Sequence, residues 1–228
     1  MKNPFKNFRE RLYQRFAHKF YARDLLLDLQ LQAKQETLEY VNGNMRHCLI
    51  CRNQKELFEY ALAKAGVTGL NAEFGVGKGD SIKVLSRLID DAVYGFDSFL
   101  GLPQDWAGTT EKQGRFAGRP GKLPGNVILY EGLFAESLPK FVREHDLPLR
   151  FMHVDCDLYS STRTIFTSLK QRIVPGTVIV FDEYFNYPNW QQHEYKAFQE
   201  FIREENRAYR YLAFTARGGS VAVEITTG

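Results

Sequence analysis

Short apolar runs that alternate with helical patterns fill the sequence from residue 69 onward and constrain its fold most strongly. Five such runs, read as strands, occupy residues 69–75, 92–97, 127–130, 149–155 and 177–183. Their nearly continuous hydrophobicity is typical of parallel strands that are covered on both faces. Apolar side chains at helical spacing lie between them, for example Ile82, Leu85 and Leu88. This alternation predicts an α/β protein with a doubly wound, Rossmann-like sheet.

The C-terminal part of the chain predicts a different strand arrangement. A helical pattern containing Ala197, Phe198 and Phe201 precedes two further apolar runs, at 209–216 and 220–226. The short "RGG" segment between these runs suits an antiparallel hairpin. We therefore expect about seven strands in one domain, which a chain of 228 residues with 44% hydrophobic content is long enough to bury.

The N-terminal part reads as a helical extension over residues 1–52, ahead of a main domain over 53–228. Helical spacing of aromatic and leucine residues predicts one helix over 4–41, followed by a loop over 42–52 and a second helix over 53–65. The first 23 residues carry seven Lys or Arg against one Glu. Packing on the main domain or on a partner subunit, as in a homodimer, is the main expectation. A weak contact of residues 1–23 with an anionic membrane surface is the alternative.

Charge, hydropathy and cysteine content exclude several classes of protein. A net charge of +3 does not indicate a nucleic-acid partner. We find no apolar run long enough to span a membrane and no secretory signal, so a cytoplasmic location is expected. The odd number of cysteines also fits a reducing compartment. Cys48 and Cys51 have redox or zinc spacing, but no second pair completes a zinc site, so ordinary thiols are the favoured interpretation.

One long segment, residues 101–125, does not follow the alternation. It contains Gly and Pro throughout, with Trp106 and Phe116 as its main candidate anchors. A loop of this length inside a compact domain is usually functional or disordered, and a lid over a ligand is the sharper hypothesis.

Two motifs point to a nucleoside-binding site. In "EFGVGKGDS" (73–81), Glu73 closes a strand and three glycines form a turn that lets the backbone approach a ligand. The spacing differs from the dinucleotide fingerprint, and the acid suits an amine-bearing ligand better than a pyrophosphate. Asp97 ends the next strand, where a carboxylate can accept from both ribose hydroxyls. Its alternative role is to cap a loop through Ser98 or a backbone donor.

Four acids cluster after two later strands. Asp155 and Asp157 follow one strand and share a face if extended geometry persists, while Asp182 and Glu183 end the next. These motifs contain no Lys or Arg, so a hard divalent cation would relieve the repulsion between the carboxylates. The alternatives are loop caps for Asp182 and Glu183 and a helix N-cap for Asp157. His153 is either another candidate base or a buried, hydrogen-bonded histidine.

Five motifs in register resemble class I S-adenosylmethionine-dependent methyltransferases, and more specifically the macrocin and mycinamicin type of O-methyltransferases. They are "EFGVGKGDS", "YGFDSFLGLP", "YEGLFAESLP", "HVDCDLYSST" and "VIVFDEY". The resemblance covers about residues 45–190. It implies a class I methyltransferase domain over 53–228 and S-adenosylmethionine as the cofactor.

The resemblance also implies roles for the acids. Asp155 and Asp182 would hold Mg²⁺, with Glu183 where the family usually has a second Asp. Asp157 occupies the position of the catalytic base, and His153 is the alternative. Because Glu is one methylene longer than Asp, the dependence on metal stays open.

Further positions that match the family are expected to contact the cofactor. These cofactor-binding positions are Glu73, Gly75, Gly77, Ser81, Asp97, Ser98, Gly132, Phe134 and Asp155. The aromatic residues expected near the acceptor are Trp106, Tyr159, Tyr184, Tyr187 and Trp190.

The predicted function is therefore methyl transfer to a hydroxyl of a small molecule, such as a sugar, glycan or natural-product moiety, with magnesium assistance. A nicotinamide-dependent oxidoreductase is one alternative, although the glycine spacing and Glu73 argue against it. A non-catalytic nucleoside-binding module is the other, and four acids around one cavity argue against that.

Overall fold

The computed structural model describes residues 4–20 and 22–227. In these residues the chain folds around one eight-stranded sheet. In chain order the strands are β1 (Leu49–Cys51), β2 (Leu70–Phe74), β3 (Val93–Asp97), β4 (Val127–Glu131), β5 (Leu149–Val154), β6 (Val178–Phe181), β7 (Ala208–Thr215) and β8 (Val221–Thr226). Their order across the sheet is β1-β7-β8-β6-β5-β2-β3-β4.

Strand direction confirms the predicted class. The neighbouring pairs β6/β5, β5/β2, β2/β3 and β3/β4 are parallel, whereas β8 is antiparallel to both β6 and β7. The fold is therefore a Rossmann-like, doubly wound sheet with the expected terminal hairpin. The strand order reverses beside β2 and β5, and ligands of such sheets bind at the carboxyl ends of the strands near this point.

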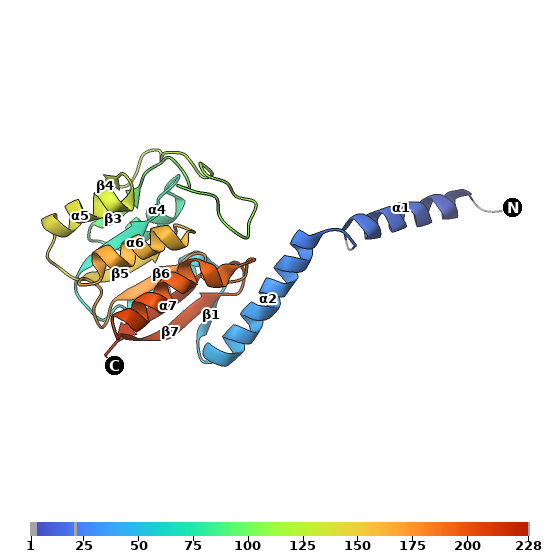
Figure 1. Ribbon diagram of the computed structural model, residues 1–228. Coiled ribbons are helices and arrows are strands. Elements are labelled where there is room, and N and C mark those ends of the chain that lie inside the picture. The colour runs from blue at the N-terminus through green and yellow to red at the C-terminus, as the bar shows by residue number, and fades with distance from the viewer. Residues whose placement is uncertain (1–3, 21, 228) are drawn as a thin grey trace.

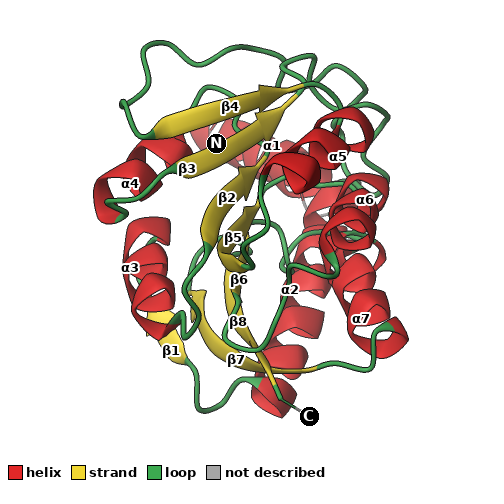
Figure 2. Cartoon of the chain, turned by 90° about the vertical axis from the view of Figure 1, so that its left-hand side faces the viewer, coloured by secondary structure: helices red, strands yellow, loops and turns green. Residues whose placement is uncertain are grey.

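Helices cover both faces of the sheet (Figure 2). Helices α3 (Gln54–Lys64) and α4 (Asp80–Leu88) lie on one face, where Phe58 and Leu85 are fully buried. Helices α5 (Phe134–Glu144), α6 (Tyr159–Leu169) and α7 (Glu194–Glu204) lie on the other, with Phe166 and Phe198 in their core. A 3₁₀ turn, η1 (Trp190–Gln192), precedes α7. Both faces of the sheet are thus buried, as the apolar runs predicted.

Two edge strands differ from the sequence prediction. Residues 42–52 were expected to form a loop, but β1 pairs with β7, so the sheet begins inside the predicted extension 1–52. Three residues are too short to show a period. The run that forms β4 was expected to be covered on both faces, yet Ile128 is 45% and Leu129 39% exposed. The reason is that β4 is the last strand in the sheet order.

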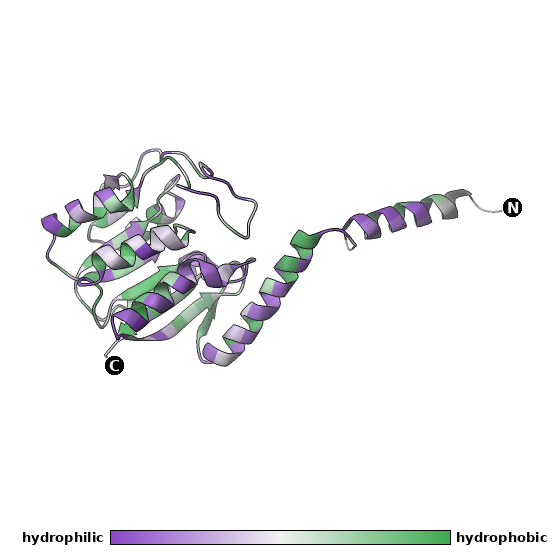
Figure 3. Ribbon diagram, in the orientation of Figure 1, coloured by the Kyte–Doolittle hydropathy of each residue, from purple (hydrophilic) through white to green (hydrophobic). Residues whose placement is uncertain are grey.

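The N-terminal segment forms two helices where one was predicted. Helix α1 (Pro4–Phe20) ends before α2 (Leu25–Asn44) begins, because the Asp24 side chain caps α2 by accepting from the Leu27 N–H at 3.2 Å. The C-terminal half of α2 packs on the domain, where the Asn186 N–H donates to Thr37 Oγ1 at 3.0 Å. Helix α1 projects far from the sheet, and apolar residues mark the projecting start of α2 (Figures 1 and 3). No helix within the described ranges is long and apolar enough to cross a membrane.

Candidate active site

A cavity of about 740 Å³ lies at the carboxyl ends of β2, β3, β5 and β6. The glycine turn after β2 and Asp97 after β3 line one half, and the acids that follow β5 and β6 line the other. The lid segment also contributes lining residues, among them Trp106. Predicted site residues that line the cavity are Gly75, Gly77, Ser81, Asp97, Ser98, Gly132, Phe134, Asp155, Asp157, Asp182 and Glu183. The sheet topology therefore gathers eleven predicted residues at one place.

Two glycines of the turn after β2 have different tasks. Gly75 has a φ of +97°, and a Cβ built there would lie 1.7 Å from the backbone oxygen of Asp155. Gly75 thus lets the turn pack directly against the end of β5. Gly77 has a φ of +51°, but a Cβ there would meet nothing within 4 Å. Gly77 therefore leaves open space in the cavity that a ligand can use.

Asp97 holds this turn in place. Its Oδ2 accepts from the backbone N–H groups of Val76, at 2.8 Å, and Gly77, at 2.7 Å. Its Oδ1 accepts from the Phe99 N–H at 2.7 Å. The loop-capping alternative is thus realised, although through backbone donors and not through Ser98. Since Asp97 also lines the cavity, a ribose contact stays open to it.

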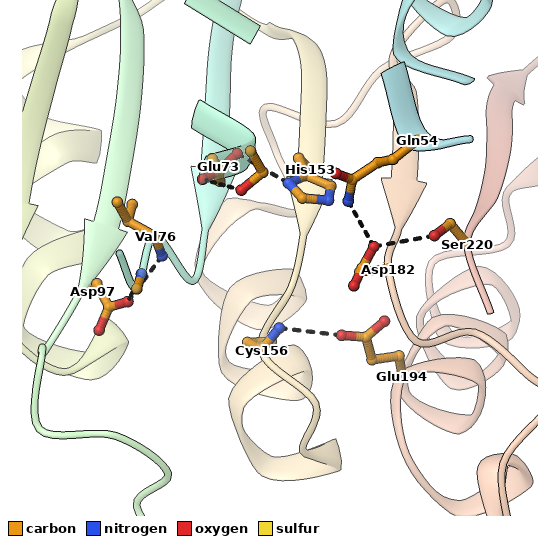
Figure 4. A network of polar contacts seen from close by, with 11 residues as sticks. Gln54, Glu73, Val76, Asp97, His153, Cys156, Asp182, Glu194 and Ser220 are labelled. Carbon is orange, nitrogen blue, oxygen red and sulfur yellow. Dashed lines mark hydrogen bonds and ion pairs between the residues drawn. The ribbon is translucent and has the colours of Figure 1, made fainter. Parts of the chain in front are cut away.

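Glu73 and His153 lie behind the cavity wall. Both are fully buried, and Glu73 Oε2 pairs with His153 Nδ1 at 3.0 Å (Figure 4). Glu73 Oε1 accepts from Ser81 Oγ at 3.0 Å, and burial raises the pKa of Glu73. The His153 ring packs edge-on against Phe58, with ring centroids 4.8 Å apart. Neither residue lines the cavity, so His153 matches the buried-histidine alternative, and Glu73 acts on the cavity through Ser81.

Asp155 and Asp157 reach the cavity through a turn, not along a strand. Strand β5 ends at Val154, and Asp157 has a φ of +62°. The extended geometry assumed in the sequence analysis therefore does not persist. The N-cap alternative for Asp157 is also wrong, because Leu158 occupies the N-cap of α6.

Three acids of the cavity, Asp155, Asp157 and Glu183, have raised pKa values. Burial, reinforced by the nearby Asp182, raises the pKa of Asp157 to about 7 and that of Glu183 to about 8. Burial and the same neighbour hold the pKa of Asp155 well above its usual range. In the described part of the chain, none of these acids forms a salt bridge with Lys or Arg. A cation bound among these carboxyl groups would relieve the repulsion between their charged forms.

The donor atoms suit Mg²⁺ in kind, since all are carboxylate oxygens. Their arrangement is not that of a closed metal site: among the described residues, no three His, Cys, Asp or Glu side chains converge on one point. Asp182 already has other partners: its Oδ1 accepts from Gln54 Nε2 at 2.7 Å and from Ser220 Oγ at 3.1 Å (Figure 4). Binding a cation would therefore require side-chain rotation.

The sequence analysis did not identify Glu194, which lies beside this cluster. Glu194 is fully buried, and its carboxyl group accepts from the backbone N–H groups of Cys156, Asp157 and Glu183. A signal existed: Glu194 precedes Ala197 and Phe198 by three and four residues, which places an acid on the core face of that helix.

Most of the aromatic residues expected near the acceptor lie elsewhere. Trp106 alone of the five lines the cavity, and its ring packs on Tyr187 at 5.3 Å. Tyr184, Tyr187 and Trp190 are buried in the core, and Tyr159 OH donates to Glu200 at 2.6 Å.

The lid, residues 101–125, contains no helix or strand, but several contacts hold it. Trp106 is 7% exposed and anchors it as predicted, whereas Phe116 is 49% exposed and does not. His193 Nε2 bonds to the backbone oxygen of Ala107 at 2.8 Å, and Arg119 pairs with Glu131 at the far side. The lid is thus attached to the segment that precedes α7.

Comparisons with known proteins agree with this fold. Residues 72–184 match a family model described as a methyltransferase domain. The fold resembles that of CalS11, a calicheamicin methyltransferase also described as a TDP-rhamnose 3'-O-methyltransferase, with a TM-score of 0.61 and 19% identity over 98% of this chain and 94% of that one. It also resembles the O-methyltransferase NovP (TM-score 0.60, 20% identity, 76% and 79% of the two chains). An O-methyltransferase from Bacillus cereus in complex with SAH is similar as well (TM-score 0.53, 18% identity, 93% and 96%). No curated protein matches the sequence.

The matched domain spans β2 to β6 and contains the glycine turn, Asp97 and the four acids of the cavity. This result favours a methyltransferase over the nicotinamide-dependent oxidoreductase and the non-catalytic module. The methyltransferase-domain match, the strand order and the cavity together support an S-adenosylmethionine-dependent methyltransferase with the class I fold.

Proposed function

We propose that the enzyme is an O-methyltransferase of the macrocin and mycinamicin type that methylates a hydroxyl of a sugar-like small molecule. One observation carries the proposal: a single cavity joins a glycine turn and Asp97 to a half lined by four carboxyl groups. Such acids suit the recognition and deprotonation of a hydroxyl. The description of CalS11 as a TDP-rhamnose 3'-O-methyltransferase supports a sugar acceptor.

The half that contains the glycine turn would bind the methyl donor. The open space at Gly77 would admit the methionine part of S-adenosylmethionine, and Asp97 would accept hydrogen bonds from its ribose hydroxyls. Gly132 and Phe134, beside the start of α5, would border the adenine. Ser81 and Asp155 complete this set of contacts, and Glu73 keeps Ser81 in position.

The acidic half would bind the acceptor. The hydroxyl oxygen attacks the methyl carbon in line, the carbon–sulfur bond breaks with its electron pair left on sulfur, and the proton passes to Asp157. After side-chain rotation, Asp155, Asp182 and Glu183 would hold Mg²⁺, and the ion would supply a positive charge that favours loss of the acceptor proton. Trp106 would give the acceptor an apolar face, and the lid would keep the acceptor oxygen near the methyl group.

The test replaces the proposed base. Asp157→Asn keeps the size of the side chain, and Asn tolerates the positive φ at this position. We expect methyl transfer to fall about 100-fold or more with unchanged affinity for S-adenosylmethionine. The assay is S-adenosylhomocysteine formation with a panel of free and nucleotide-linked sugars, after calorimetry of the donor with and without Mg²⁺ and with a dinucleotide control. Unchanged turnover in the variant would remove Asp157 from the mechanism, and absence of donor binding by the wild type would refute the proposed function.

We also propose a cytoplasmic homodimer assembled through α1 and α2. Apolar residues of both helices are exposed, among them Leu12 at 59% and Leu29 at 48%. Helix α1 is basic, whereas α2 has three acids and one Lys, so the helices of two copies are complementary in charge. The three cysteines are free thiols, in keeping with a reducing compartment. Light scattering after size-exclusion chromatography should give twice the monomer mass; a monomer that sediments with anionic vesicles would favour membrane contact instead.

A further inference from the structure

Glu194 is a buried acid that the proposed reaction does not use directly. It is the first residue of α7 and is fully buried, and in the described part of the chain no Lys or Arg pairs with it. A buried carboxyl group is costly unless hydrogen bonds compensate for the lost water. Its presence on the core face of a helix therefore requires partners.

The partners are three backbone N–H groups from two different loops. Glu194 Oε1 accepts from Cys156 and Asp157, each at 3.2 Å, in the loop that follows β5. Glu194 Oε2 accepts from Glu183, at 3.3 Å, in the segment that follows β6. Figure 4 shows the carboxyl group of Glu194 turned toward the backbone of Cys156. One side chain on α7 thus connects the ends of two neighbouring strands.

The residues that Glu194 holds are members of the acidic cluster. Asp157 has a φ of +62°, in the left-handed region that is uncommon for L-residues, although Asp and Asn adopt it more often than most. The N–H of Asp157 is bound by Glu194, so the direction in which the Asp157 side chain leaves the backbone depends on that bond. Glu183 is held by the other oxygen of the same group.

We infer that Glu194 is a positioning residue, whose carboxyl group fixes Asp157 and Glu183 relative to each other for methyl transfer. The inference rests on the proposed function of these acids. Glu194 would touch neither donor nor acceptor; it acts through the backbone of the two residues. Its loss should therefore lower kcat and leave the binding of the methyl donor, on the other half of the cavity, nearly unchanged.

The test compares two Glu→Gln substitutions on the same helix. Glu194→Gln keeps the shape but replaces one acceptor oxygen with an NH₂ group, which cannot accept from a backbone N–H. One of the two loops then loses its bond. Glu200→Gln is the matched control, because Glu200 accepts from the Tyr159 hydroxyl and does not bond to either loop.

For Glu194→Gln we expect kcat to fall about 10- to 100-fold, while the Kd for S-adenosylmethionine changes less than about threefold. Glu200→Gln should stay within about twofold of the wild type in both quantities. Wild-type kcat in folded Glu194→Gln, or equal losses in donor affinity and kcat, would overturn the inference. A wild type that methylates no sugar while it binds the donor would instead count against the proposed function.

Hydrogen exchange of the wild-type protein tests the same inference. It needs no methyl acceptor, and it does not depend on whether a variant folds. If one carboxyl group holds the amides of Cys156, Asp157 and Glu183, the three should exchange with similar protection, through one common opening. The inference would be overturned if the amides of one loop were protected while those of the other exchanged freely.

Discussion

Replacing Asp97 with Asn tests whether this acid serves the fold as well as the ligand. The carboxylate accepts three backbone N–H groups at 2.7–2.8 Å, from Val76, Gly77 and Phe99. If Asp97 only bound a ribose, its replacement would not change the stability of the ligand-free protein. We expect a different result, because these bonds connect the glycine turn to the end of β3.

The size of the effect follows from the bond count. With its oxygen on the Val76 and Gly77 donors, the Asn side chain turns its NH₂ group toward the Phe99 N–H and loses that bond. Leaving one donor unsatisfied costs about 1–3 kcal/mol, and the two remaining bonds weaken because the acceptor is no longer charged. Since Asp97 is only partly buried, we expect a loss of about 2–3 kcal/mol in the free energy of unfolding.

Equilibrium unfolding in urea, without cofactor, measures this loss. With an m-value of about 2.5 kcal/mol/M, the unfolding midpoint should fall by about 1 M. The matched control is Asp105→Asn in the lid, where an exposed carboxylate accepts one backbone N–H, from Gln113 at 2.9 Å. The control should shift the midpoint by less than about 0.2 M. The reasoning would be refuted if the unfolding midpoint of Asp97→Asn shifted as little as that of the control, while its affinity for S-adenosylmethionine fell.

Two further predictions concern the turn and the lid. Gly75→Ala should not yield folded protein, because its Cβ would lie 1.7 Å from the Asp155 backbone oxygen, whereas Gly77→Ala should fold and bind the donor about 10-fold or more weakly. Circular dichroism and calorimetry check this pair, and a normal melting curve for Gly75→Ala would contradict the close approach. Trp106→Ala removes the buried anchor of residues 101–125, so trypsin should cleave that segment about 10-fold faster or more. Unchanged cleavage would show that other contacts hold the lid.

The fold was predictable wherever one element buries enough side chains to leave a period in the sequence. The seven expected strands begin and end within two residues of the predicted ranges. The failures concern elements without such a period. β1 is three residues long, and the break between α1 and α2 depends on one capping bond from Asp24.

Most of the cavity-lining acids and glycines of the candidate site were predictable, but their inner arrangement was not. Strand ends that meet at one edge of a parallel sheet bring their acids together, so Asp97, Asp155 and Asp182 share one cavity. The sequence could not show that Glu73 and His153 pair behind the wall, since that depends on which face of each strand the neighbouring helix covers.

The sequence by itself determined the class of fold, the glycine turn and the acidic motifs, because strand periodicity and short local motifs depend on residues close together in the chain. Tertiary structure alone decided which polar groups meet. Glu194 bonds to Cys156 and Asp157, and Gln54 bonds to Asp182, across separations of 37 to 128 residues. Contacts at such distances leave no local pattern, since each partner has its own reason to lie where its helix or strand places it. The arrangement of the acids, unlike their presence, is therefore a property of the folded chain.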